Sequence, residues 1–504
     1  MADVEPPMNP RTLVVLCVIA LGCSVAGCVS RKLNYPNKVP IAIKADGRPD
    51  ANSVIYPAES RNQSRGVPLK VPLAIIEFGD QGDARDKSQI EAAKLMIRNV
   101  RKPLLVVYVH GWHNNATTYP ARFPLLLNML AESPHIRRDG YQVVGVYIGW
   151  HGKVYSDLLL EYGATFWSRY EAGARLGAGV DCLAAISDVV AEAREHNDAR
   201  TFLIGHSFGA LVLQQAIAQS VSAAKRDGSS FAPADLTLFL NSASDSEITR
   251  QMIERLRTTV KVEGGAESAP IFASITSATD SATKNFFKIG RTLGSGGKAF
   301  DEYEVDREDG TSRSVSGSYF YKHTPGHNLY LRSHVTSDLG PVAKPAGYLN
   351  AFEANLETNI NPKHAVFRTS DSTTGQWRSW SLEPVVDPVT PYWVILADQE
   401  IMDGHNDVFN ERSIAMMAAL YRMNNQLKAR VKDIKLARTG RAEQKVALPA
   451  AQKVEEYIRE IKNAPPSGKP STPVPMTMPP GAASPGPTEA RTPPGRPSRR
   501  ASGN

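Results

Sequence analysis

The feature that most constrains the fold is a repeated alternation of short apolar runs with longer helical stretches, beginning at residue 71. Runs that are apolar along their whole length are typical of strands in a parallel sheet covered on both faces by helices. The runs are LAIIEFG (73–79), LLVVYVHG (104–111), VVGVYIGW (143–150), TFLIG (201–205), LTLFLNSA (236–243), PIFASITS (270–277) and YWVILAD (392–398). The sequence therefore predicts an α/β fold with a mainly parallel sheet.

Changes in composition divide the chain into further regions. Residues 28–70 are rich in Asn, Pro, Arg and Ser and are predicted to be a linker to the folded domain, 71–430. Within that domain, 284–388 has few apolar runs and is predicted to be a cap-like insertion of loops and hairpins. A charged helical extension is expected over 431–463, and the proline-rich segment 464–504 is expected to be a disordered tail.

The charge distribution and motif content exclude several functions. The chain has a formal net charge of +7, but a cluster of arginines in the last segment supplies much of it and no basic stripe indicates a nucleic-acid interface. The histidines are scattered and the cysteines are few, so no metal-ligand spacing is apparent. No phosphate-binding glycine loop occurs either, and we expect neither a metal nor a cofactor.

The N-terminus resembles a bacterial lipoprotein signal peptide. The apolar block LVVLCVIALGCSVAG (13–27) is shorter than the roughly 20 residues that span a bilayer. It ends in Val-Ala-Gly before Cys28, which is similar to the lipobox, where a peptidase cuts before a lipidated cysteine. This resemblance implies a signal peptide over 1–27, a lipid on Cys28 and anchoring in the bacterial cell envelope, at the outer membrane or the outer face of the cytoplasmic membrane. The alternatives are an uncleaved anchor and a chance apolar stretch.

The stretch TFLIGHSFGALVLQQ (201–215) contains a G-x-S-x-G motif between a predicted strand and a predicted helix. In that context the serine, Ser207, occupies a sharp turn that exposes its hydroxyl above the sheet. Gly205 and Gly209 relieve crowding around the turn, and the Phe208 N–H at the helix start is directed at a developing oxyanion. The alternative is an ordinary strand-to-helix turn.

A second loop suits an oxyanion hole. VVYVHGWHNNA (106–116) is an apolar strand that stops at His110 and Gly111. With the serine motif, this loop resembles the α/β-hydrolase superfamily, in which a histidine–glycine loop supplies the second backbone donor. The resemblance assigns that donor to Trp112, and we expect His110 and Asn114 to brace the loop.

The resemblance also implies the order serine, acid, histidine along the chain. His405 follows the last predicted strand in a polar loop and is the predicted base. The main alternative is His334, and the remaining downstream histidines are His323, His327 and His364.

The predicted acid is Asp280, directly after the strand 270–277, with Asp245 one strand earlier as the alternative. Asp403 and Asp407 flank His405 and could orient it.

These residues predict a serine hydrolase that cleaves small-molecule or lipid-like carboxylic esters through an acyl-enzyme. A serine peptidase or amidase, a lipase, and a non-catalytic envelope scaffold stay open as alternatives. The aromatic residues of the insertion either line the substrate site or form the core of a small β unit; they include Tyr319, Phe320, Tyr321, Tyr330 and Trp377.

Overall fold

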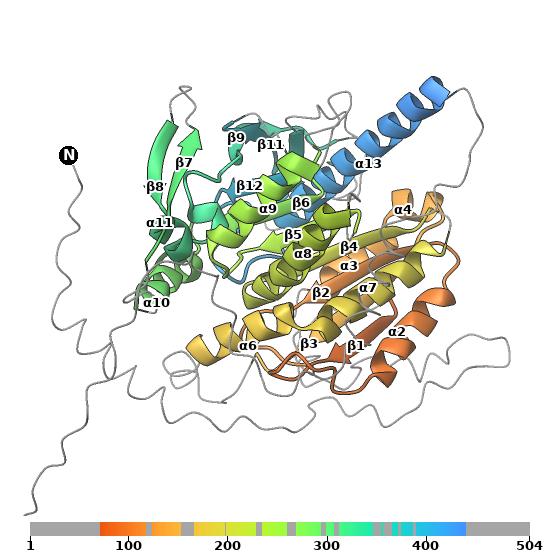
Figure 1. The fold of residues 1–504 in the computed structure, drawn as a ribbon. Coiled ribbons are helices and arrows are strands. Elements are labelled where there is room, and N and C mark those ends of the chain that lie inside the picture. Colours follow the sequence, from red (N-terminus) through yellow and green to blue (C-terminus); the bar gives the residue numbers. More distant parts are fainter. Residues whose placement is uncertain are drawn as a thin grey trace, which may run out of the picture. The chain divides into compact units, whose positions relative to one another are not determined.

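The structure is a computed structural model, and it describes most of the chain between residues 71 and 439 (Figure 1). The described ranges are 71–116, 123–152, 166–196, 198–227, 234–259, 269–293, 299–306, 312–345, 354–355, 365–370, 374–386 and 390–439. The predicted signal peptide, Cys28, the linker 28–70 and the tail 464–504 lie outside these residues.

The described residues form an α/β architecture around a mostly parallel sheet, as the apolar runs predicted. The main sheet has the order β1-β3-β2-β4-β5-β6-β12-β9-β11-β10 among the described strands, and the pairs from β1 to β12 are all parallel. The parallel strands are β1 (Leu73–Glu77), β2 (Pro103–Val109), β3 (Gln142–Gly149), β4 (Arg200–His206), β5 (Leu236–Leu240), β6 (Phe272–Ser277) and β12 (Tyr392–Ala397).

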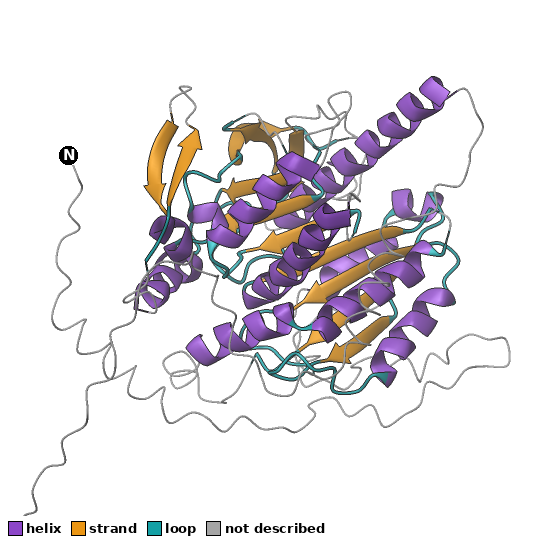
Figure 2. Ribbon diagram, in the orientation of Figure 1, coloured by secondary structure: helices purple, strands orange, loops and turns teal. Residues whose placement is uncertain are grey.

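Helices cover both faces of this sheet (Figure 2). The alternate side chains of β2 pack against helices on opposite faces. All seven β2 residues are buried; Val106 packs into the core on one face, and Val107 packs into the core on the other. The first face is covered by α3 (Phe123–Glu132), α4 (Pro134–Arg138) and α13 (Glu411–Thr439). The second is covered by α2 (Ser88–Arg98), α6 (Phe166–Ala178), α7 (Val180–Arg194), α8 (Phe208–Asp227) and α9 (Ser246–Thr259). Burial on both faces explains the continuous apolar runs.

The region predicted as an insertion differs from a separate cap. Its strands β9 (His334–Val342), β11 (Trp377–Pro384) and β10 (Ala365–Ser370) extend the main sheet, with antiparallel pairing of β11 to both neighbours. The reason is a period-two pattern: Trp380 and Leu382 of WRSWSLEP face the same core as α13. A two-stranded hairpin of β7 (Glu302–Asp306) and β8 (Ser312–Ser316) does lie apart from that sheet, as expected for hairpins.

Shorter helices surround the hairpin and the end of β6. They are the π-helical turn η2 (Ala282–Phe286), α10 (Phe287–Leu293), α11 (Gly317–Lys322) and the 3-10 turn η3 (Pro325–His327). Within this group Phe320 is almost fully buried and its ring packs against Tyr303 and Tyr330, so these aromatics serve a local core. Trp377 packs with Ala354 and Ala415 in another small core.

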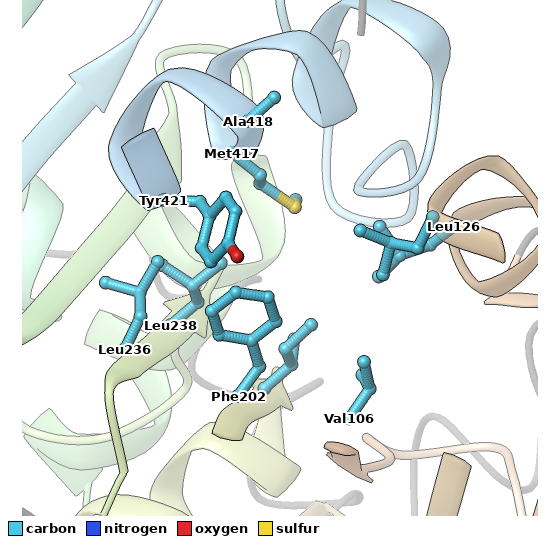
Figure 3. Close-up of a pocket in the computed structure, with 10 residues that line it drawn as sticks. Val106, Leu126, Phe202, Leu236, Leu238, Met417, Ala418 and Tyr421 are labelled. Atoms are coloured by element: carbon cyan, nitrogen blue, oxygen red, sulfur yellow. The ribbon is translucent and has the colours of Figure 1, made fainter. Parts of the chain in front are cut away.

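A small cavity of about 30 Å³ lies between the sheet and the helices α3 and α13 (Figure 3). Its lining is apolar apart from one tyrosine ring: Val106, Leu126, Leu130, Phe202, Ile204, Leu236, Leu238, Met417, Ala418 and Tyr421. Phe202 and Leu236 stand near the beginnings of β4 and β5, so the cavity lies away from the carboxyl ends of these strands. A space of this size and polarity is a packing gap rather than a substrate pocket.

In the described part of the chain, no helix combines the length and apolar character needed to cross a membrane. The predicted charged extension is described as far as Thr439, where α13 ends.

Candidate functional site

The strand order places two loops at the point where the chain direction across the sheet reverses. β2 and β4 are parallel neighbours. The chain leaving β2 reaches α3 on one face, whereas the chain leaving β4 enters α8 on the other. Ligands of open α/β sheets bind outside the carboxyl ends of the strands at such a reversal. The loop with Gly111 and Trp112 and the turn with Ser207 both lie there.

Ser207 occupies a strained turn between β4 and α8. Its φ of 56° is in the left-handed region, which a non-glycine residue rarely adopts. The turn is fixed by hydrogen bonds to the next strand: the Ser207 N–H donates to the Leu240 carbonyl over 3.0 Å, and the Ser207 carbonyl accepts from the Ala243 N–H over 3.1 Å. The central serine of the G-x-S-x-G motif is therefore held by hydrogen bonds against the end of β5 and the residues that follow it.

Close backbone packing explains the two glycines of the motif. A Cβ on Gly205 would lie 2.7 Å from the Ala210 Cα, and a Cβ on Gly209 would lie 2.5 Å from the His110 carbonyl oxygen. Both separations are too short for real contacts, so only glycine fits. The start of α8 consequently packs against the end of β2, which brings the first-turn Phe208 N–H beside the loop of Trp112.

His110 holds the loop after β2 in one orientation. Its Nε2 accepts a hydrogen bond from the Trp150 N–H at 2.9 Å, so its proton is on Nδ1, which donates to the Gly111 carbonyl at 2.7 Å. Burial lowers the pKa of His110 to about 4 and keeps the ring neutral. Because the peptide bond is planar and trans, the Trp112 N–H points away from the His110 ring. Asn114 adds a 3.3 Å hydrogen bond to the Trp112 carbonyl.

The predicted base and acid meet Ser207 at the same edge of the sheet. His405 Nε2 lies 2.8 Å from Ser207 Oγ, and His405 Nδ1 lies 2.8 Å from Asp280 Oδ2. The three side chains come from the ends of β4, β6 and β12, separated by up to 198 residues. With Nδ1 protonated toward the carboxylate, Nε2 is free to accept the serine proton.

Asp280 is buried but well supplied with donors. Its Oδ2 also accepts from Thr283 Oγ1 at 2.6 Å, and its Oδ1 accepts from the Ala282 and Thr283 N–H groups at 3.0 and 3.2 Å. Burial by itself would raise the pKa of Asp280, but the hydrogen bonds from His405 and Thr283 hold that pKa below its usual value. Asp280 is therefore a carboxylate at neutral pH.

The two main alternatives to Asp280 and His405 lie in other environments. Asp245 accepts hydrogen bonds from Tyr170 and from Arg291, with which it forms a 2.9 Å ion pair, while His334 stacks on Trp393 within the sheet. His327 lies in η3 beside the backbone of Asp280, and burial lowers its pKa to about 4.

Asp403 and Asp407 serve the loop of His405. Asp403 accepts from Thr279 Oγ1 at 3.2 Å, and Asp407 accepts from the Asp403 N–H at 3.2 Å and from Asn410 at 2.6 Å. Asp407 therefore holds the backbone of this loop, and Asp403 connects the loop to Thr279.

Aromatic side chains pack together next to the loop after β2. The Trp112 ring lies 5.7 Å from Phe166 and 5.8 Å from Phe208, and Tyr170 lies 5.9 Å from Phe208. Phe208 and Tyr170 are buried, so this cluster belongs to the core beneath the start of α8.

No family model matches the chain, and no curated protein is detectably similar to it. The function must therefore be argued from the site. In the described part of the chain, no group of His, Cys, Asp or Glu side chains has the arrangement of a metal site.

Sequence reasoning did not single out Thr283, Asn241 or His206. Thr283 follows Asp280 at a spacing that lets one turn of helix return its hydroxyl to the carboxylate. Asn241 ends the apolar run of β5, and His206 precedes the serine; a polar residue at the end of a buried strand was the available signal.

Proposed function

We propose that the chain is a serine hydrolase of the α/β-hydrolase superfamily that cleaves carboxylic esters through an acyl-enzyme. The observation that carries this proposal is the continuous hydrogen-bonded series Ser207–His405–Asp280, with both contacts at 2.8 Å. The strained φ of Ser207 and the glycines around it add support, because they are the features of a nucleophile at a strand-to-helix turn.

The chemistry follows from the positions of the three side chains. Ser207 Oγ attacks the acyl carbonyl carbon while its proton passes to His405 Nε2, and the buried Asp280 carboxylate stabilises the imidazolium. When the tetrahedral intermediate collapses, the proton moves to the leaving alkoxide and the alcohol departs. Water then repeats the same steps on the acyl-enzyme, which releases the acid and restores Ser207.

The oxyanion is assigned to the backbone N–H groups of Phe208 and Trp112. Phe208 N–H belongs to the first turn of α8, where N–H groups have no partner within the helix. Trp112 N–H is oriented by the bond between His110 and the Gly111 carbonyl. One donor of this type typically contributes about 100- to 1,000-fold in rate.

The test is labelling with a fluorophosphonate, which reacts with activated serines. We expect the full chain to be labelled, Ser207→Ala to lose labelling, and Ser244→Ala to keep it. Ser244 is a suitable control because it is buried one strand away and bonds to Ser242 and Gln214 rather than to a histidine. Folded wild-type protein that is not labelled and hydrolyses none of a series of acyl esters would overturn the proposal.

The choice between ester and amide bonds is tested with matched substrates. p-Nitrophenyl esters and p-nitroanilides with the same acyl group, short or long, differ only in the leaving group. We expect hydrolysis of the esters; faster turnover of the anilides would favour the peptidase or amidase alternative.

We also propose that the protein is a lipoprotein of the bacterial cell envelope, on the strength of the apolar block and Cys28. In a bacterial host, radioactive palmitate should label the wild type but not Cys28→Ser, and only the wild type should lose residues 1–27. Equal palmitate labelling of the two proteins, or wild-type protein that keeps residues 1–27, would refute the lipid anchor.

A further inference from the structure

The backbone carbonyl of His405 is held by two buried side chains. Asn241 Nδ2 donates to the His405 carbonyl at 2.8 Å and to the neighbouring Gly404 carbonyl at 3.0 Å. His206 Nε2 donates to the same His405 carbonyl at 2.9 Å. The base is therefore fixed through its main chain as well as through its ring.

Asn241 also forms a hydrogen bond with the end of β6, the strand that precedes Asp280. Its Oδ1 accepts from the Ser277 N–H at 2.8 Å, at the end of β6, and the Ser277 carbonyl accepts from the Asp280 N–H at 3.2 Å. Both amide N–H groups and the amide oxygen of this side chain are thus used. One side chain connects the acid-bearing segment with the base-bearing loop, which is 164 residues away from Asn241.

The backbone of Asn241 is strained in order to reach both segments. Its φ is 43°, in the left-handed region that asparagine tolerates better than most residues, and the residue is fully buried. Strain of this kind persists only where the surrounding contacts enforce it.

The contact of His206 defines its protonation state. A carbonyl oxygen only accepts, so Nε2 carries the proton. Burial, followed by the charge on the nearby His405, lowers the pKa of His206 to about 3. The ring is therefore a neutral donor.

We propose that Asn241 is a positioning residue that, together with His206, sets the orientation of His405 between Ser207 and Asp280. This inference rests on the proposed serine-hydrolase function. Displacements of about 1 Å at a reacting group cost on the order of 100-fold in rate. Removing the amide lets the loop of His405 shift, so the rate of serine activation falls while the residues around Trp112 are unchanged.

The chain contains a matched control in Asn424. This asparagine is also buried, and its Nδ2 also donates to two backbone carbonyls, those of Asp235 at 2.8 Å and Pro270 at 2.9 Å. These carbonyls precede β5 and β6, at the opposite end of the strands from the triad. Loss of the Asn424 amide removes two buried hydrogen bonds and loss of the Asn241 amide removes three, but only Asn241 touches the base.

The experiment compares Asn241→Gly, which keeps the left-handed backbone accessible, with Asn424→Ala. We expect Asn241→Gly to lower kcat about 10- to 100-fold with KM within about threefold of wild type. Asn424→Ala should lose stability but keep kcat within about threefold. Equal kcat in Asn241→Gly and wild type, or equal losses of kcat in both variants, would refute the positioning role. If Asn241→Gly does not fold, Asn241→Asp is measured in the same way, since it keeps the shape and the acceptor to Ser277 but lacks the donor.

A second readout does not depend on hydrolysis. In protein with ¹⁵N-labelled histidine, the hydrogen-bonded Nδ1 proton of His405 is identified by its loss in His405→Gln. We expect Asn241→Gly or Asn241→Asp to shift this resonance or speed its exchange with water, and Asn424→Ala to leave it unchanged. An unchanged resonance in the Asn241 variants overturns the inference even if the protein is a hydrolase. A changed resonance in a protein that fluorophosphonate does not label supports the positioning role of Asn241 while overturning the proposed function.

Discussion

Gly111 lies directly against Ser207: a Cβ atom on Gly111 would come within 2.6 Å of the Ser207 Cβ and 2.8 Å of the His206 carbonyl oxygen. Neither neighbour can yield easily, because Ser207 is held in a strained turn and His206 belongs to β4. The spacing between the two loops is therefore set by the absence of a side chain at position 111.

Gly111→Ala tests this spacing. We predict that the added methyl pushes the Trp112 N–H away from the oxyanion and lowers kcat for an ester substrate by about 100-fold or more, the size of effect expected for a lost oxyanion donor. Steady-state kinetics measures it. Gly173→Ala is the control, because a Cβ there meets neighbours only at ordinary distances of 3.7 Å or more. Normal kcat in Gly111→Ala would show that the loop is not packed against the nucleophile in this way.

His110→Phe tests the brace of the same loop. Phenylalanine keeps a ring between Tyr147 and Trp150, whose centroids lie 5.3 and 5.5 Å away, but it loses the bonds to the Trp150 N–H and the Gly111 carbonyl. We predict a loss of about 1–3 kcal/mol in the free energy of unfolding, because a buried N–H is left without an acceptor. We also predict at least a 10-fold loss of kcat, since an unrestrained peptide costs part of the contribution of one oxyanion donor. His135→Phe, in the surface helix α4, should change neither quantity.

Two of the buried histidines, His110 and His206, predict how stability depends on pH. Burial lowers the pKa of His110 to about 4 and the pKa of His206 to about 3, below the ordinary histidine value of 6.5. Between the lowered pKa of each histidine and 6.5, the unfolded chain binds a proton on that histidine and the folded chain does not. Their contribution is therefore complete above pH 6.5 and is lost as the pH falls toward 4, by about 1.4 kcal/mol per pH unit for each histidine.

Urea unfolding at several pH values measures this dependence. The free energy of unfolding of wild type should fall between pH 6.5 and pH 4.5, and His110→Phe should show a slope that is shallower by about 1.4 kcal/mol per pH unit. Parallel slopes for the two proteins would mean that His110 takes up a proton in the folded state. Asp280 contributes to stability in a different pH range. Because its pKa is lowered in the folded protein, its stabilisation is lost only as the pH falls below the ordinary aspartate pKa of 3.8.

Sequence patterns predict the parallel half of the sheet well, because a strand buried on both faces must be apolar throughout. They predict β9 to β11 poorly, because those strands bury one face and alternate Trp380 and Leu382 with polar residues. The spacing of Ser207, Asp280 and His405 along strand ends is also readable, since carboxyl ends of parallel strands share one edge. The hydrogen bond from Asn241 to the His405 carbonyl cannot be predicted from the sequence, because it is a contact between residues 164 positions apart.

Replacing each candidate acid by its amide separates their roles. We predict that Asp280→Asn lowers kcat by about 10³- to 10⁴-fold, because an amide in that position favours the wrong tautomer of His405 and cannot stabilise its cation. Asp245→Asn should lower kcat less than about 10-fold while destabilising the fold by about 3 kcal/mol or more, because it leaves the buried guanidinium of Arg291 without its ion-pair partner. Ester kinetics and urea unfolding of the two variants distinguish these effects. The opposite pattern, with the larger kcat loss in Asp245→Asn, would move the acid to the end of β5.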